Sequence, residues 1–433
     1  MNKLTKLNVM NEDFLQYLWK TRCFDHHFLM TTEGESLEII RQGMHNRDSG
    51  PDFFNARIRI GETVWAGNVE VHLRASDWKR HRHDDDDAYN NVILHVVYES
   101  DEPLRRKTGE LVPALELQGR IDTKLYDQYL RLQQSRSWIP CEKQLKTVDS
   151  LTMTGWLGRM MVERLEQRSD AILQSLYLNK NNWDESFYRH LARYFGMKVN
   201  ADPFEWLASS LPYKILAKHA GQVNQVEALL FGQAGLLPEK EGDEYVCRLR
   251  KEYNFLKKKY QLNGLQREQW KFMRMRPVNF PTVRLAQLAA LILNNPRLFR
   301  SCMEAETLEE LQQLFQVKPS PYWHYHYRFG MPGDRRTKSL GHLSVRTLLI
   351  NTVAPFLFVY GRRNGDDRYC ERALDFLTRL EAEDNTIIQG WKQAGLVPGS
   401  AFESQALLQL KKQYCDYRRC LDCGIGCRLL KIS

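Results

Sequence analysis

The sequence lacks the apolar segments that would place it in or across a membrane. It contains no run of about 18 consecutive apolar residues, the length that a membrane-spanning helix needs. Its opening residues, MNKLTKLNVMNEDF, have neither the apolar stretch nor the small-residue cleavage site of a secretory signal. We therefore predict a cytoplasmic protein that does not enter a membrane.

Cysteine is sparse over most of the chain, which argues against a scaffold built on disulfides. Five of the nine cysteines are scattered singly, as small buried residues often are: Cys23, Cys141, Cys247, Cys302 and Cys370. Apolar cores must stabilise the protein instead. The chain has 433 residues, of which 43% are apolar, and this is enough for two or three domains.

The other four cysteines crowd into the C-terminal tail. They are Cys415, Cys420, Cys423 and Cys427, with a C-x4-C-x2-C-x3-C spacing. Thiolates at this spacing suit a structural Zn²⁺ ion or an iron–sulfur cluster, and Cys141 is a candidate ligand from outside the tail. The alternative is a terminal helix with a cysteine-bearing face, although two glycines in this segment disfavour a continuous helix.

Acidic residues are comparatively few in the later part of the chain. Residues 1–140 carry 19 Lys and Arg against 22 Asp and Glu, whereas residues 141–433 carry 43 against 31. This excess of positive charge favours an anionic partner such as nucleic acid. A moderately basic surface that serves only solubility is the alternative.

Apolar periodicity divides the chain into a sheet part and a helical part. Residues 11–24 have the period of an amphipathic helix, with Asn11 as its cap. Five segments rich in branched residues are typical of strands: 36–43, 51–61, 64–73, 91–100 and 111–119. From residue 121 onward the pattern is mostly helical. The sequence thus predicts an α+β protein, with a mixed-sheet domain and flanking helix over residues 1–120 and a large mainly α-helical domain over residues 121–433.

The strand predicted at residues 52–60 divides its side chains between two faces. A strict period of two puts Asp52, Phe54 and Ala56 on one face and Phe53 on the other. Gly61 can then turn the chain into the next strand. The acidic residue Asp52 is therefore expected at the start of the apolar face.

A second acidic residue lies on the next predicted strand, where Glu70 and His72 point to the same side. Carboxylates from adjacent strands can converge on Mg²⁺ or Mn²⁺, and such a site can activate water for attack on a phosphodiester. We therefore predict that Asp52 and Glu70 bind a metal in a nuclease site. The alternative is a solvated hairpin in which Asp52 is a turn residue.

This order of elements resembles the PD-(D/E)xK nuclease core. A helix and a strand precede Pro51-Asp52, and Glu70-Val71-His72 follows in the next strand. The resemblance implies a restriction-endonuclease-like fold in which Asp52 and Glu70 bind the metal. It also implies that the Val71 carbonyl and a helix acid such as Glu12 assist. His72 stands where the family has a catalytic lysine, and a neutral imidazole offers less positive charge to a phosphate.

A second resemblance covers almost the whole chain. The segments GPDFFNARI, WAGNVEVH, RPVNFPTVRLAQLA, INTVAPFLFVYG and CLDCGIG are similar to those of a bacterial family known only as a domain of unknown function. The resemblance implies that the sheet and helical parts act together.

Histidines next to the hairpin offer a rival metal chemistry. The candidate ligands are His72, Asp77, His81, His83, the run Asp84–Asp87, and His95 from a neighbouring strand. Imidazole and carboxylate groups suit Zn²⁺ or Mn²⁺ in a metallohydrolase. The alternatives are a solvated acidic turn for the loop and a buried, hydrogen-bonded role for His95.

The helical part contains one segment, 247–277, in which basic and aromatic residues alternate. Lys257, Lys258 and Lys259 can neutralise phosphates, and rings such as Tyr253 and Trp270 can stack on bases. Aromatic residues at helical spacing also commonly fill a core, which is the alternative.

The functional hypothesis is a metal-dependent nuclease-like enzyme with Asp52, Glu70 and His72 as its catalytic residues. The alternatives are a nucleic-acid-binding protein with an inactive site and a scaffold protein. The sequence does not indicate an oligomeric state.

Overall fold

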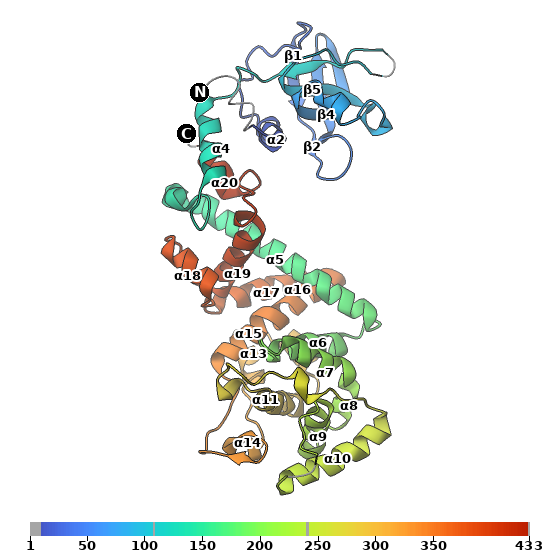
Figure 1. The fold of residues 1–433 in the computed structure, drawn as a ribbon, viewed down its shortest axis with the longest axis vertical. Coiled ribbons are helices and arrows are strands. Elements are labelled where there is room, and N and C mark those ends of the chain that lie inside the picture. The colour runs from blue at the N-terminus through green and yellow to red at the C-terminus, as the bar shows by residue number, and fades with distance from the viewer. Residues whose placement is uncertain (1–9, 107–108, 240–241, 432–433) are drawn as a thin grey trace. The chain divides into compact units, whose positions relative to one another are not determined.

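The computed structural model describes residues 10–106, 109–239 and 242–431, and the chain forms two compact units (Figure 1). The sheet unit comprises Met1–Trp156 and Lys411–Ser433, and the helical unit comprises Leu157–Leu410. The protein is α+β, as predicted. The division differs from the predicted boundary at residue 120, because residues 121–156 and the cysteine-rich tail pack with the sheet.

Helix α2 (Glu12–Thr21) opens the described part of the sheet unit. Asn11 caps it as predicted, since its side chain accepts a hydrogen bond from the Phe14 N–H at 3.1 Å. Phe14, Leu15 and Leu18 are fully buried, and the helix lies against strand β4. Its apolar face therefore fixes the acidic first turn of α2 close to the sheet.

The sheet is mixed and has six strands: β1 (Leu37–Arg41), β2 (Met44–His45), β3 (Phe53–Ile60), β4 (Thr63–Arg74), β5 (Val92–Glu99) and β6 (Ala114–Glu116). The strand order is β1-β3-β4-β5-β6, and β2 pairs with β3. Strand β3 is antiparallel to β1, β2 and β4, whereas β4, β5 and β6 are parallel to one another. Gly61 and Glu62 connect β3 to β4, as the sequence predicted.

A bulge in β3 changes which side chains face the core. The pairing with β4 shifts register between Phe53 and Ala56, and Asn55 lies in the left-handed region with φ 58°. Phe53 and Ala56 are therefore both buried, while Phe54 is only half-buried. The strict alternation predicted for this strand was wrong at Phe53 and Phe54, because the extra residue reverses the face.

The connection from β4 to β5 returns the chain to a parallel neighbour. It contains α3 (Asp77–Arg80) and the 3-10 helix η1 (Asp87–Tyr89). The buried carboxylate of Asp77 accepts a hydrogen bond from the Arg74 N–H at 3.0 Å and pairs with Arg80 at 2.9 Å. These contacts hold the loop against the end of β4.

The core of the sheet unit combines distant segments of the chain. Helix α4 (Thr123–Gln134) stacks Tyr129 on Phe14 with 4.6 Å between ring centroids. In the tail, the π-helix η6 (Lys411–Cys415) is followed by α20 (Gly424–Lys431), and Cys420 and Leu430 join the same core. The 3-10 helix η2 (Glu142–Thr147) completes this unit.

The helical unit consists of consecutive helices that pack on one another (Figure 1). Helix α5 (Ser150–Leu178) begins in the sheet unit and leads into the helical unit. The others are α6 (Trp183–Phe195), α7 (Ala201–Ser210), α8 (Tyr213–Lys218), α9 (Val223–Gln233), α10 (Glu244–Tyr260), η3 (Arg267–Gln269), η4 (Pro277–Asn279), α11 (Pro281–Asn294), α12 (Leu298–Glu304), α13 (Leu308–Leu314), α14 (Tyr322–Tyr325), α15 (His342–Leu348), the π-helix η5 (Leu349–Val353), α16 (Ala354–Asn364), α17 (Asp367–Arg379), α18 (Thr386–Gln393) and α19 (Ala401–Leu410). A small hairpin of β7 (His326–Arg328) and β8 (Met331–Pro332) follows α14.

One stretch of the helical unit, His342–Asn364, is long and apolar enough to cross a membrane by length and composition alone. It combines α15, η5 and α16. Within its most apolar window, 67% of the residues are buried inside the protein, as in a core helix. The stretch is therefore weak evidence for a membrane span. The cytoplasmic location stays a prediction.

Candidate functional site

Asp52 and Glu70 meet across strands β3 and β4, as the sequence predicted. The Asp52 backbone N–H donates a hydrogen bond to Oε2 of Glu70 at 3.0 Å. In return, Oδ2 of Asp52 accepts one from the Val71 N–H at 3.0 Å, and Oδ1 accepts one from the Gln16 side chain at 2.8 Å. Both carboxyl groups are thus held in place by the backbone of the neighbouring strand.

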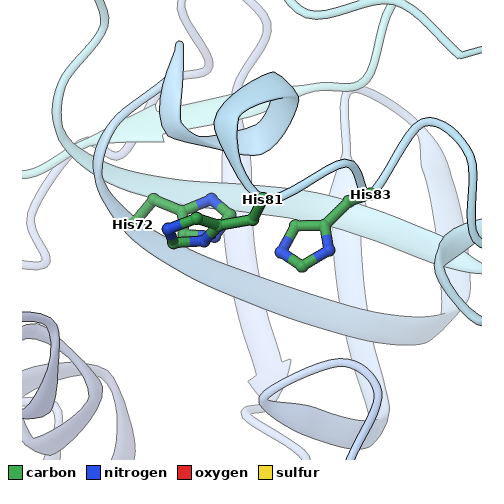
Figure 2. Close-up of side chains that lie close together, drawn as sticks. All are labelled: His72, His81 and His83. Atoms are coloured by element: carbon green, nitrogen blue, oxygen red, sulfur yellow. The ribbon is translucent and has the colours of Figure 1, made fainter.

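Three histidines gather at the other oxygen of Glu70. Nε2 of His72, on β4, and Nε2 of His83, in the β4–β5 loop, each lie 3.4 Å from Oε1 of Glu70. His81 follows α3, and its Nδ1 is 3.2 Å from Nε2 of His72. One ring nitrogen from each of His72, His81 and His83 lies within 4.8 Å of the others, and Figure 2 shows the three rings grouped beside β4. Such a group can hold one metal ion.

Neighbouring side chains orient these imidazole rings. Nδ1 of His72 lies 2.9 Å from Nε2 of the fully buried His95 on β5. If Nδ1 of His72 donates in this pair, its Nε2 lone pair faces Glu70, as in metal-ligating histidines. The ring of His83 stacks on Tyr89 with 3.8 Å between centroids.

Burial raises the pKa of both carboxyl groups in the metal-free protein. Burial, and then the charge of Glu70, raises the pKa of Asp52 to about 7. Burial raises the pKa of Glu70 to about 8, and the charge of Glu12 on α2 adds to this rise. The charge of Glu12 therefore acts on both carboxyl groups, and its role in the site stays a prediction.

His72 and His95 are neutral in the metal-free protein at neutral pH. Burial, and then the charge of His95, lowers the pKa of His72 to about 2. Burial also lowers the pKa of His95 to about 3. A neutral His72 beside Glu70 can bind a metal, and it supplies no positive charge of its own.

Three acidic residues of the β4–β5 loop, Asp77, Asp86 and Asp87, have structural contacts outside this group. Asp77 fixes the start of α3, as described above. Asp86 accepts a hydrogen bond from the Ala88 N–H at 2.9 Å, and Asp87 accepts one from the Asn90 side chain at 3.1 Å. These contacts favour the structural interpretation of the acidic run.

A cavity of about 540 Å³ opens beside Asp52. Its walls come from α2, the segment after β2, α4 and the tail, all within the sheet unit. Its lining includes four cationic side chains: Lys20, Arg47, Arg418 and Arg419. The pKa of His45 in the same wall is lowered by burial and then by the charges of Lys20 and Arg47. The lining also includes Asp13, Asp48 and Asp422, and Asp422 pairs with Arg47 at 2.5 Å and with Arg419 at 3.1 Å, so the cavity wall carries both signs of charge.

The tail cysteines separate into two groups. Cys415, Cys420 and Cys423 line a small cavity together with Cys141. Cys427 instead hydrogen-bonds the Leu421 carbonyl oxygen at 3.1 Å and packs against the main core. Burial raises the pKa of Cys420 to about 12 and that of Cys141 to about 11. The predicted set of four tail cysteines is therefore not assembled as one group.

The predicted nucleic-acid segment lies on α10 of the helical unit. Lys257, Lys258 and Lys259 are exposed in its last turn. The aromatic residues differ from the expectation, because Tyr253 and Trp270 are buried. Trp270 also donates a hydrogen bond to the Ala234 carbonyl oxygen at 2.7 Å. The lysines remain available to an anionic partner, whereas these two rings fill the core.

Comparison with known proteins establishes the family of the chain. A family model described as "Protein of unknown function (DUF2851)" matches residues 12–386. The chain belongs to this family. The matched DUF2851 region contains Glu12, Asp52, Glu70 and the histidines, and it ends before the cysteine-rich tail. Neither the curated proteins nor the solved structures give a match.

Two residues of this DUF2851 site escaped the sequence reasoning. Gln16 holds Asp52, and it could have been found as the residue one helical turn after Glu12. Tyr89 supports His83 from a short 3-10 helix, and the local sequence carries no signal for that stacking.

The pKa shifts predict how the stability of the metal-free protein depends on pH. Between about pH 6.5, the ordinary pKa of histidine, and pH 8, the folded state holds protons on Asp52 and Glu70 that the unfolded state has lost. The free energy of unfolding should therefore fall as pH rises through this window. Below it, the neutral histidines have the opposite effect, because the unfolded state binds their protons.

Chemical denaturation at a series of pH values, with a chelator present, measures this slope. Glu70→Gln should flatten it, and the exposed Glu62→Gln on the same hairpin should leave it unchanged. An equal slope in wild type and Glu70→Gln would show that Glu70 does not titrate in this range.

Proposed function

We propose that the sheet unit is a metal-dependent, nuclease-like enzyme that hydrolyses phosphodiester bonds of nucleic acid. The convergence on Glu70 carries the proposal. One of its carboxyl oxygens lies 3.4 Å from Nε2 of both His72 and His83, and the other accepts the Asp52 N–H. Glu70, His72 and His83 are buried or half-buried polar side chains gathered at one point. The free-energy cost of burying them is hard to explain by a structural role alone.

The donor set favours Mn²⁺ or Zn²⁺ over Mg²⁺, because imidazole nitrogen suits these ions and Mg²⁺ prefers oxygen. The predicted choice of Mg²⁺ or Mn²⁺ rested on carboxylates alone. A divalent ion bound at this point would lower the pKa of a bound water and polarise the phosphate. Glu70, His72 and His83 would hold the ion, with His81 completing the set.

Asp52 is placed to handle the proton of the attacking water. Its carboxyl group is fixed by the Gln16 side chain and the Val71 N–H, so it cannot rotate away from Glu70. A carboxylate held beside a metal site can accept a proton from water as it attacks. Lys20 and Arg47 in the adjacent cavity would bind the flanking phosphates.

The resemblance to the PD-(D/E)xK core supports this function and also limits it. Glu12 on the helix, Asp52 at the start of β3 and Glu70 on β4 follow the order of that core. The position of the lysine holds His72, which is neutral and buried. In this chain the metal, with Lys20 in the adjacent cavity, would therefore provide the positive charge that the lysine provides there.

Substitution of the two acids tests the reaction. Asp52→Asn and Glu70→Gln should each reduce Mn²⁺-dependent cleavage of a labelled nucleic acid by at least about tenfold to a hundredfold, the loss typical even for groups that only orient metal ligands. Glu62→Gln should retain full activity. If the wild type binds metal yet cleaves neither DNA nor RNA with any divalent ion, the protein binds nucleic acid without cutting it.

A lysine at position 72 separates the two roles of His72. An ammonium group has no lone pair for a metal, so His72→Lys should lose Mn²⁺ affinity in a calorimetric titration, together with activity. If His72 only stands in for the family's lysine, the variant would instead keep or gain activity. Circular dichroism spectra confirm that the buried lysine has not unfolded the sheet.

Neutralising the basic turn of α10 tests the nucleic-acid partner. Replacing Lys257, Lys258 and Lys259 by Gln should weaken nucleic-acid binding. The slope of log K against the logarithm of the salt concentration should become shallower by up to about three, because each lysine accounts for one phosphate contact. The control replaces three other exposed lysines of the helical unit: Lys198, Lys214 and Lys218. A salt slope that is equal in both variants would exclude α10 as a contact surface.

A further inference from the structure

Four cysteines from two distant segments line one small cavity in the sheet unit. Cys141 precedes η2, and the other three, Cys415, Cys420 and Cys423, come from the tail. The cavity measures about 20 Å³, which is room for one water-sized body. Cys420 and Cys423 are buried, so their sulfur atoms face the interior and not solvent.

Two backbone N–H groups point at the sulfur of Cys423, whose pKa is raised by burial, so that this thiol is neutral until a cation binds. The N–H groups of Ile425 and Gly426, in the first turn of α20, both hydrogen-bond this sulfur. Donors at a helix N-terminus stabilise a thiolate far more than a neutral thiol. This hydrogen bonding is independent of the cavity and points to the same ligand chemistry.

Glycine makes the tight turn of this segment possible. A Cβ atom at Gly426 would lie 2.1 Å from the Cys420 carbonyl oxygen, and one at Gly424 would lie 2.6 Å from the Trp156 ring. Any larger residue would force the Cys420 and Cys423 turns apart. The sequence Cys-Gly-Ile-Gly therefore allows the two sulfur-bearing turns to approach each other.

We propose that Cys141, Cys415, Cys420 and Cys423 form a tetrathiolate metal centre, and that Cys427 is not a ligand. Four thiolates bind either a tetrahedral Zn²⁺ ion or an iron–sulfur cluster. Each ligating thiol releases its proton to solvent as the metal binds. The centre joins the chain before the helical unit to the chain after it, and it does not depend on the proposed nuclease function.

Metal analysis of the purified full chain tests this centre. Mass spectrometry should find close to one equivalent of zinc, or the iron of one cluster, and visible absorbance distinguishes the cluster from zinc. X-ray absorption should show a shell of sulfur at about 2.3 Å, which separates this centre from one bound by the histidines. A wild-type protein with no metal–sulfur shell would overturn the proposal.

Two cysteine variants decide which thiols are ligands. The content of sulfur-bound metal in Cys141→Ser should be at least tenfold lower than in the wild type, and this variant should melt at a lower temperature. Cys427→Ser should keep the metal. The reverse result would assign the site to the tail alone and contradict our assignment. If Cys141→Ser fails to fold, Cys141→His provides the second test, because it should retain zinc with one nitrogen in its shell. Retention with an unchanged sulfur shell would exclude Cys141.

Discussion

The burial of the Glu70 carboxyl group is the constraint on which the sheet unit depends. A carboxylate removed from water is costly unless hydrogen bonds, a proton or a cation compensate it. The protein supplies the Asp52 N–H to one oxygen and imidazole nitrogens to the other. Asp52 is constrained in turn, because its own oxygens accept from β4 and α2. The apolar packing of α2 on the sheet thus places hydrogen-bond donors around two buried acids.

The β4–β5 connection brings two of the candidate ligands, His81 and His83, to the site. A parallel pair requires a crossover, and here the crossover is short and carries His81 and His83 back over the strand that bears His72. Asp77 holds its start and Tyr89 supports its end. The histidines therefore approach Glu70 from the loop, while the cavity lies beside Asp52.

Local signals in the sequence were sufficient for the elements but not for their tertiary contacts. The Asn11 cap, the five predicted strands and the Gly61 turn depend on neighbouring residues, and they are present in the structure. The side-chain face of Phe53 depends on a bulge that pairing with β4 imposes, and periodicity cannot show it. The grouping of Cys141 with the tail cysteines joins residues far apart in sequence. The carboxylate pair could be predicted because both acids lie on one hairpin, whereas the role of Tyr89 required the fold.

The sheet unit is built from two separate stretches of the chain, so the ribosome synthesises its two parts at different times. Tyr417 to Asp422 form part of the cavity wall beside Asp52, and they are translated only after the whole helical unit. At about 5–20 residues per second, residues 157–410 separate the two halves by about 10 to 50 seconds. During that interval a nascent chain carries both acids without the arginines of the tail. The emerging chain therefore lacks one wall of the cavity beside Asp52 while it is still attached to messenger RNA and ribosomal RNA.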